Sequence, residues 1–90
     1  MLVLTAKGSL VNIDKCNGIY TTENCQIEAD FGDRVKLNYT LGSYESMDIA
    51  KEVLRQLAGI IAYGSDNKVI DINDIGKMVM YEAKTGRKYE

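Results

Sequence analysis

Few residues in this 90-residue chain could do chemistry, and histidine is not among them. Histidine is the side chain that most often moves protons near neutral pH and most often binds transition metals. Cys16 and Cys25 have no neighbouring base that would activate a thiolate, and two cysteines alone do not complete a tetrahedral zinc site. Glu28 and Asp30 are two residues apart on a strand face that we expect to be in water. We therefore expect a protein that is not an enzyme and has no catalytic residue, no metal and no cofactor.

Residues 71–82 partly match the pattern of a calcium-binding loop. Four residues match the first, third, sixth and twelfth places of a calcium-binding loop: Asp71, Asn73, Gly76 and Glu82. The fifth place is Ile75, which has no side-chain oxygen, and the preceding KVIDI is typical of a strand rather than of the expected helix. The pattern therefore does not predict a calcium site.

Residues suited to binding are better represented than residues suited to catalysis. Arg34, Lys36 and Asn38 alternate along one face of a predicted strand, where they could contact a phosphate-bearing ligand or a partner protein. Five of the six tyrosines are not required by the core pattern and could anchor an interface: Tyr20, Tyr44, Tyr63, Tyr81 and Tyr89. The alternative is that the charged face is only solvated and that the tyrosines fill edges of the fold.

Charge and composition limit the kinds of partner and the cellular compartment that we expect. The net charge of -2 comes from 11 basic and 13 acidic side chains, which is too balanced to favour nucleic acid. No charged-then-apolar leader and no apolar stretch long enough to span a membrane are seen. We expect a cytoplasmic protein with reduced thiols, and a disulfide between Cys16 and Cys25 is the alternative.

The chain is expected to form a single domain, 1–90, that begins with a β-meander over residues 1–41. LVLTA and SLVNI flank the turn signal Lys7-Gly8 and predict a hairpin, and GIYTTE predicts a third strand. CQIEADF and RVKLNYTL alternate apolar and polar residues, which predicts a second hairpin around Gly32-Asp33-Arg34. Asp30 should then lie opposite Lys36, and three apolar pairs should face the core: Phe31 with Val35, Ala29 with Leu37 and Ile27 with Tyr39.

The spacing of apolar residues predicts a main helix over 46–63. Ser46 is a suitable N-cap, Gly64 is a suitable end, and Glu52 can pair weakly with Arg55. The residues expected to face the core include Val53, Leu54, Leu57 and Ile61.

The remaining residues, 65–90, form a C-terminal extension in which NKVIDI predicts a strand. The segment after it fits either a helix, with Asn73 as its cap and Gly86 as its end, or a strand. The predicted fold is α+β: an antiparallel meander of four or five strands with one long amphipathic helix packed on its apolar face, followed by a strand and a short helix or strand.

The segment YTLGSYESMDIAKEVLRQL resembles small proteins of Firmicutes and of their phages and prophages, for which no activity is settled. The matching residues are Leu41, Gly42, Tyr44, Ala50, Val53 and Leu54, and the resemblance extends loosely over residues 1–63. Glycine is expected to permit the strand-to-helix turn, and the other positions are core. The resemblance implies a bacterial or phage-borne accessory protein and transfers no catalytic residue.

These observations predict a non-enzymatic accessory module, homo-oligomeric, that binds an unknown protein partner, such as a phage-borne inhibitor of a host protein. The alternative is a protein that binds or sequesters a small ligand, such as a nucleotide. The candidate binding residues for both functions are Arg34, Lys36, Asn38, Tyr20 and Tyr44.

Overall fold

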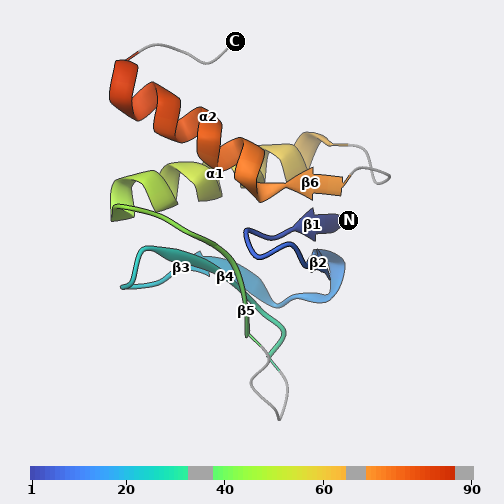
Figure 1. Ribbon diagram of the computed structural model, residues 1–90. Coiled ribbons are helices and arrows are strands. Elements are labelled where there is room, and N and C mark those ends of the chain that lie inside the picture. Colours follow the sequence, from blue (N-terminus) through green and yellow to red (C-terminus); the bar gives the residue numbers. More distant parts are fainter. Residues whose placement is uncertain (33–37, 65–68, 87–90) are drawn as a thin grey trace.

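Two three-stranded sheets and two α-helices make up the part of the chain that the computed structural model describes, residues 1–32, 38–64 and 69–86 (Figure 1). The α+β class is thus confirmed. The first sheet is mixed and has the order β2-β1-β6. Its strands are β1 (Leu2–Leu4), β2 (Leu10–Asn12) and β6 (Val69–Asp71). The second sheet is antiparallel, with the order β3-β4-β5. Its strands are β3 (Gly18–Thr21), β4 (Gln26–Asp30) and β5 (Asn38–Ser43).

The expected single meander is wrong. The first hairpin, β1 and β2, does not join β3 but pairs through β1 with β6, from the other end of the chain. β1 and β6 are parallel, with Val3 opposite Ile70. This arrangement makes β1 a central strand and leaves Val3 with no exposed surface. The two sheets meet where the backbone N–H of Ala6 donates to the carbonyl oxygen of Leu41 at 2.9 Å.

The predicted register of the second hairpin is also wrong. Ala29 lies opposite Tyr39 instead of Leu37, Ile27 lies opposite Gly42 instead of Tyr39, and Asp30 lies opposite Asn38 instead of Lys36. The expected loop Gly32-Asp33-Arg34 falls partly outside the described residues. A bulge between Ile27 and Glu28 shifts the pairing again and leaves Leu41 as an extra residue. The predicted partners Val35, Leu37 and Lys36 lie outside the described residues.

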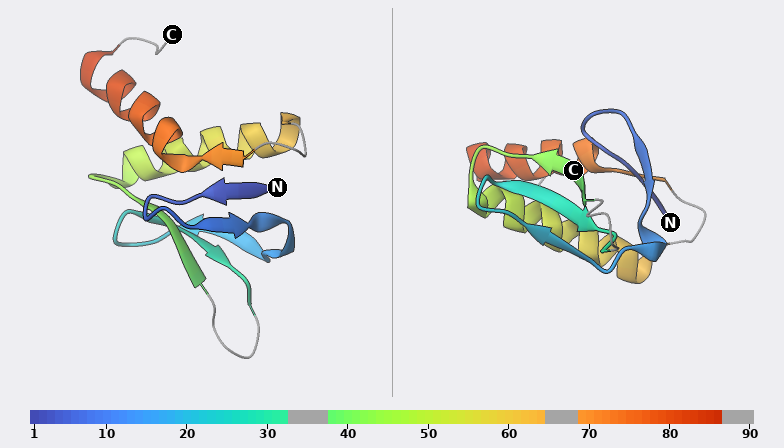
Figure 2. Two further views of the ribbon diagram at one scale, coloured as in Figure 1. Left: turned by 45° about the vertical axis from the view of Figure 1, so that its right-hand side comes forward. Right: turned by 90° about the horizontal axis from the view of Figure 1, so that it is seen from below.

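The main helix, α1 (Met47–Tyr63), begins and ends as predicted. The Ser46 hydroxyl accepts a hydrogen bond from the backbone N–H of Ile49 at 3.3 Å, which satisfies one free donor of the first turn. Gly64 follows the last residue, in an extended conformation rather than the left-handed one common at this position. Val53 and Leu57 are fully buried, whereas Ile61, predicted as core, is 38% exposed. Seen from below, α1 runs behind β3 and β4, which it contacts (Figure 2).

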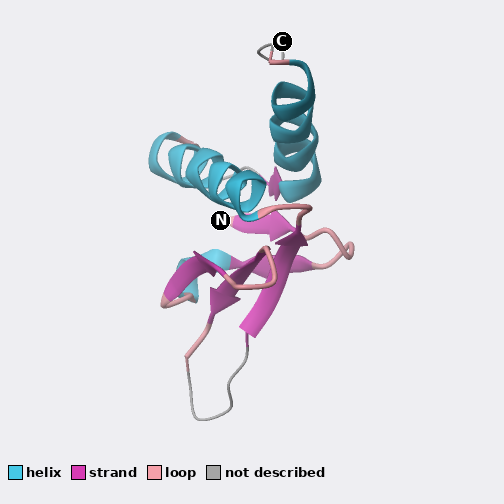
Figure 3. Ribbon diagram, turned by 90° about the vertical axis from the view of Figure 1, so that its left-hand side faces the viewer, coloured by secondary structure: helices cyan, strands magenta, loops and turns pink. Residues whose placement is uncertain are grey.

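The ambiguous C-terminal segment is a helix, α2 (Ile72–Thr85). Its N-cap is Asp71 and not Asn73, because the Asp71 carboxylate accepts the backbone N–H of Asn73 at 2.9 Å. Gly86 ends it as predicted, in the left-handed conformation with φ 68°. Both helices lie on the same side of the antiparallel sheet, and α2 rises away from the strands beside α1 (Figure 3).

A single apolar core joins both sheets and both helices. Val3 and Ile70 come from the mixed sheet, Ile27 and Leu41 from the antiparallel sheet, and Leu57 from α1. α2 adds three buried aliphatic residues: Ile72, Ile75 and Val79. The C-terminal extension is therefore part of the core, and its buried face fixes the position of α2.

Candidate functional site

Tyr44 is the residue around which the candidate site is built. It follows β5 directly, and its backbone N–H donates to the carbonyl oxygen of Cys25 at 2.9 Å, which holds the chain against the turn after β3. Its ring lies over two glycines. A Cβ at Gly76 would lie 3.3 Å from the ring, and a Cβ at Gly42 would lie 2.8 Å from Cζ and would overlap the hydroxyl. A side chain at Gly42 would therefore force the Tyr44 ring to shift, and one at Gly76 would press tightly against it. Gly42 was expected to permit the turn from strand to helix, but it lies within β5 without a positive φ, and its role is to leave room for the ring.

Burial raises the pKa of Tyr44 to about 12. Desolvation disfavours the phenolate, so the neutral phenol is the form present at neutral pH. In the described part of the chain no hydrogen bond of the Tyr44 hydroxyl is found, and no buried side-chain nitrogen or oxygen lacks a partner. Tyr44 also lines a groove beside α2.

This groove, called here the α2 groove, has a volume of about 660 Å³. One wall is formed by Ser43 at the end of β5 and by Tyr44 and Glu45 in the connection to α1. The other wall is one flank of α2, whose residues recur at helical spacing: Asn73, Gly76, Lys77, Met80, Tyr81 and Lys84. Ile72 and Ala6 complete the lining. Because the opposite flank of α2 is anchored in the core, the groove has one rigid helical wall.

The α2 groove combines apolar and cationic side chains. Tyr81 is 41% exposed and Met80 is half-buried, so apolar surface is available between the walls. Lys77 and Lys84 are exposed on the helical wall, and Glu45 is exposed on the other. Over residues 1–32, 38–64 and 69–86, no ion pair involves either lysine. The groove therefore presents two cations and one carboxylate to a ligand.

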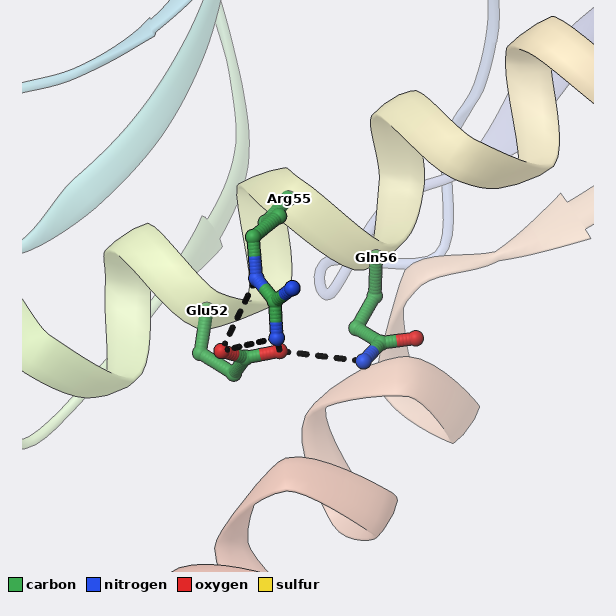
Figure 4. Close-up of polar contacts among 3 residues, drawn as sticks. All are labelled: Glu52, Arg55 and Gln56. Atoms are coloured by element: carbon green, nitrogen blue, oxygen red, sulfur yellow. Dashed lines mark hydrogen bonds and ion pairs between the residues drawn. The ribbon is translucent and has the colours of Figure 1, made fainter.

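The other flank of α2 has the opposite charge balance. There a hollow of about 520 Å³ between α1 and α2 is lined by Asp48, Glu52 and Glu82, and Arg55 is the one cation among its described lining residues. Arg55 and Glu52 form the predicted pair, with Nη2 2.6 Å from Oε2, and Gln56 donates to the same carboxylate at 3.0 Å (Figure 4). These hydrogen bonds, first from Arg55 and then from Gln56, lower the pKa of Glu52. This carboxylate is already partnered within α1, so the hollow is a weaker candidate for a ligand.

Of the three predicted binding residues that the structure describes, Tyr20 and Asn38 lie together and Tyr44 lies apart from them. The Asn38 side-chain amide donates to the Tyr20 hydroxyl at 3.1 Å across the antiparallel sheet. Tyr44 lines the α2 groove, whose lining includes neither of them. Arg34 and Lys36 lie outside the described residues, so the predicted nucleotide alternative, which depends on them, stays a prediction.

Of the α2 residues that complete the site, Tyr81 was among the tyrosines singled out from the sequence, whereas Lys77, Met80 and Lys84 were not. Lys77, Met80, Tyr81 and Lys84 fall in the segment that fitted both a helix and a strand. Their spacing of three and four residues was the available signal, since it places them on one helix face. A strand would have divided them between two faces.

The structure of residues 71–82 does not fit a calcium-binding loop. Asp71 caps α2, and Asn73, Gly76 and Glu82 lie within the helix, where their side chains do not surround one point. Among the described residues no group of three or more cysteine, aspartate or glutamate side chains could hold a metal ion. Cys16 and Cys25 are both free, so the alternative of a disulfide between them is not seen.

Comparison with known proteins adds no assignment, because no protein-family model, no curated protein and no solved structure matches this chain. Neither helix in the described ranges has the length and apolar character needed to cross a membrane.

Proposed function

We propose that this chain is a non-enzymatic protein-binding module that holds a segment of its partner in the α2 groove. The observation that carries this proposal is an open groove of about 660 Å³ in which Tyr44, Met80 and Tyr81 lie beside two lysines without ion pairs in the described part of the chain. Tyrosine and methionine are enriched in protein interfaces, where they contribute large contact areas.

The groove walls are anchored in the fold, which supports a binding site rather than a surface hollow without function. α2 is fixed by Ile72, Ile75 and Val79 on its buried flank, and Tyr44 is fixed by its contacts with Gly42 and Gly76. Side chains that are held in place before binding lose less conformational freedom when a partner arrives. The walls are thus suited to specific binding.

The kind of partner follows from the resemblance to Firmicute phage and prophage proteins. We propose that the chain is a phage-borne accessory protein and that its partner is a host protein. Binding would inhibit this host protein by occupying a segment that it uses for another interaction.

The proposal is tested by affinity capture from a bacterial host lysate, with the wild-type chain and two tyrosine variants. Tyr81→Ala removes an aromatic ring from the α2 groove, whereas Tyr63→Ala removes one from the end of α1, where Tyr63 is 93% exposed and lines no part of the groove. We expect Tyr81→Ala to reduce capture of the partner at least tenfold and Tyr63→Ala to leave it unchanged. Circular dichroism shows whether both variants keep the fold. Equal capture by all three chains would refute the groove as the binding site.

A further inference from the structure

The two lysines of the α2 groove indicate what kind of segment it binds. Lys77 and Lys84 are seven residues apart, which is about two turns and about 10.5 Å along the helix, so they lie on the same face. Met80 and Tyr81 lie between them. The helical wall therefore presents a cation, an apolar surface and a second cation in a row.

A segment complementary to this row carries two carboxylates with apolar residues between them. A polyproline II segment rises about 3.1 Å per residue with three residues per turn, so side chains three residues apart point the same way about 9 Å from each other. The flexible lysine side chains can cover the remaining difference. Such segments also bind aromatic-lined grooves, because they are extended before binding and lose little entropy. Tyr44 and Tyr81 supply the aromatic surfaces.

Glu45 sets the direction in which the carboxylates point. It lies on the wall opposite the two lysines, where a second carboxylate would be repelled. Of the other acidic side chains near α2, Asp48 and Glu82 line the hollow on its other flank, and Asp74 is exposed in the first turn of the helix but does not line the groove. Among the described residues, the charged α2 side chains that line the groove are therefore the two lysines.

We infer that the α2 groove binds an extended acidic segment of its partner, with two carboxylates three residues apart that contact Lys77 and Lys84 and with apolar residues between them that contact Met80 and Tyr81. This inference rests on the proposed function and names the chemistry of the partner.

The test is a selection from a peptide-display library of random sequence on the immobilised chain, followed by fluorescence-polarisation titration of the enriched peptides. We expect enrichment of sequences with two acidic residues three positions apart around proline or leucine. Lys77→Glu combined with Lys84→Glu should weaken these peptides at least tenfold, equivalent to about 1.4 kcal/mol. The same double variant should instead enrich peptides with basic residues at that spacing.

Two further measurements distinguish weaker peptide binding from a loss of folding and from binding of other ligands. Glu45→Gln should tighten the acidic peptides severalfold, a gain that misfolding cannot produce, and added salt should weaken them. The inference is overturned by an enrichment of neutral or basic sequences on the wild-type chain, or by no enrichment. It is also overturned if ATP binds the groove more tightly than the peptides, or if the groove is filled by a second copy, seen as a molecular mass that falls in the double variant.

The inference and the proposed function can fail separately. If Tyr81→Ala abolishes capture from the lysate but the library yields no acidic sequences, the groove remains a protein-binding site and only its acidic partner is wrong. If acidic peptides bind but no lysate protein does, the inferred chemistry stands and the proposed function fails.

Discussion

The ring of Tyr44 occupies space that two glycines leave open, so each of these positions constrains the other. We predict that Gly42→Ala destabilises the protein by about 1–3 kcal/mol, the usual cost of extra volume in a packed region, because the new Cβ would overlap the Tyr44 ring. Urea unfolding measures the change. Gly59→Ala in α1 is the matched control: its Cβ would meet nothing within 4 Å, and alanine should stabilise the helix by up to about 1 kcal/mol.

A double-mutant cycle tests whether the Tyr44 ring is the cause. In a Tyr44→Ala background the Gly42→Ala cost should fall, because the clashing atoms are gone. An unchanged cost in that background would show that glycine at this position serves the backbone and not the ring.

Tyr44 should also make stability depend on pH in alkaline solution. Its pKa of about 12 in the folded protein is above the value of about 10 expected for an unfolded chain. The unfolded state therefore loses its proton first, and the stability that the neutral phenol contributes is present below about pH 10 and is lost as the pH rises towards about 12. We predict one tyrosine that ionises late in a near-ultraviolet absorbance titration. Tyr44→Phe should remove this late step and flatten the alkaline decline, and a wild-type titration without a late step would contradict the prediction.

At the scale of elements, α1 is held to the antiparallel sheet by only part of its predicted apolar stripe. We predict that Leu57→Ala costs about 2–5 kcal/mol, the range for truncating a fully buried aliphatic side chain. Ile61→Ala, four residues further along the same stripe, should cost clearly less because Ile61 is 38% exposed. Thermal or urea unfolding compares the two variants, and equal losses would mean that another copy or partner covers Ile61.

The limits of sequence analysis are also clearest at this scale. The caps and apolar spacing of α1 are local features, so Ser46, Val53 and Leu57 could be placed correctly. Ile61 could not, because its exposure depends on the hollow that Ile13 and Ile19 line beside α1. The alternation in β4 correctly placed Ile27 and Ala29 in the core, but the register of β5 depends on the length of the connection and on the bulge at Leu41, which no local pattern marks.

The candidate site was less predictable than the fold. Tyr44 could be selected as a tyrosine that the core pattern does not require. Its role, however, depends on a contact with Gly76, which is distant in the sequence. Lys77, Met80 and Tyr81 belong to a segment whose pattern fitted two structures, and the helix is favoured by contacts with α1, β1 and β5 that the local pattern does not show. The pairing of β6 with β1 joins the first and the last of the described strands, and such long-range parallel pairing has no short-range signal.

At the scale of the whole molecule, this parallel pairing makes residues 65–90 part of one cooperative structure rather than an appendage. We predict that a chain ending at Gly64 does not fold. Removing β6 would leave β1 without one neighbour, and four buried residues would be lost from the core: Ile70, Ile72, Ile75 and Val79. At about 1.5–3 kcal/mol for each buried aliphatic side chain, the loss totals about 6–12 kcal/mol, which is comparable to the whole stability of about 5–15 kcal/mol usual for a small domain.

Circular dichroism and urea unfolding measure this outcome directly. The chain ending at Gly64 should lose most of its helical signal, including that of α1, and should show no cooperative transition, because α1 packs on a core that the missing residues help to form. The full-length variant Ile72→Ala is the graded control and should unfold cooperatively with a loss of about 2–5 kcal/mol. A shortened chain with a cooperative transition and an intact α1 would show that the antiparallel sheet and α1 fold alone. The α2 groove would then be an addition to an independent unit, and its rigid wall would no longer follow from the core.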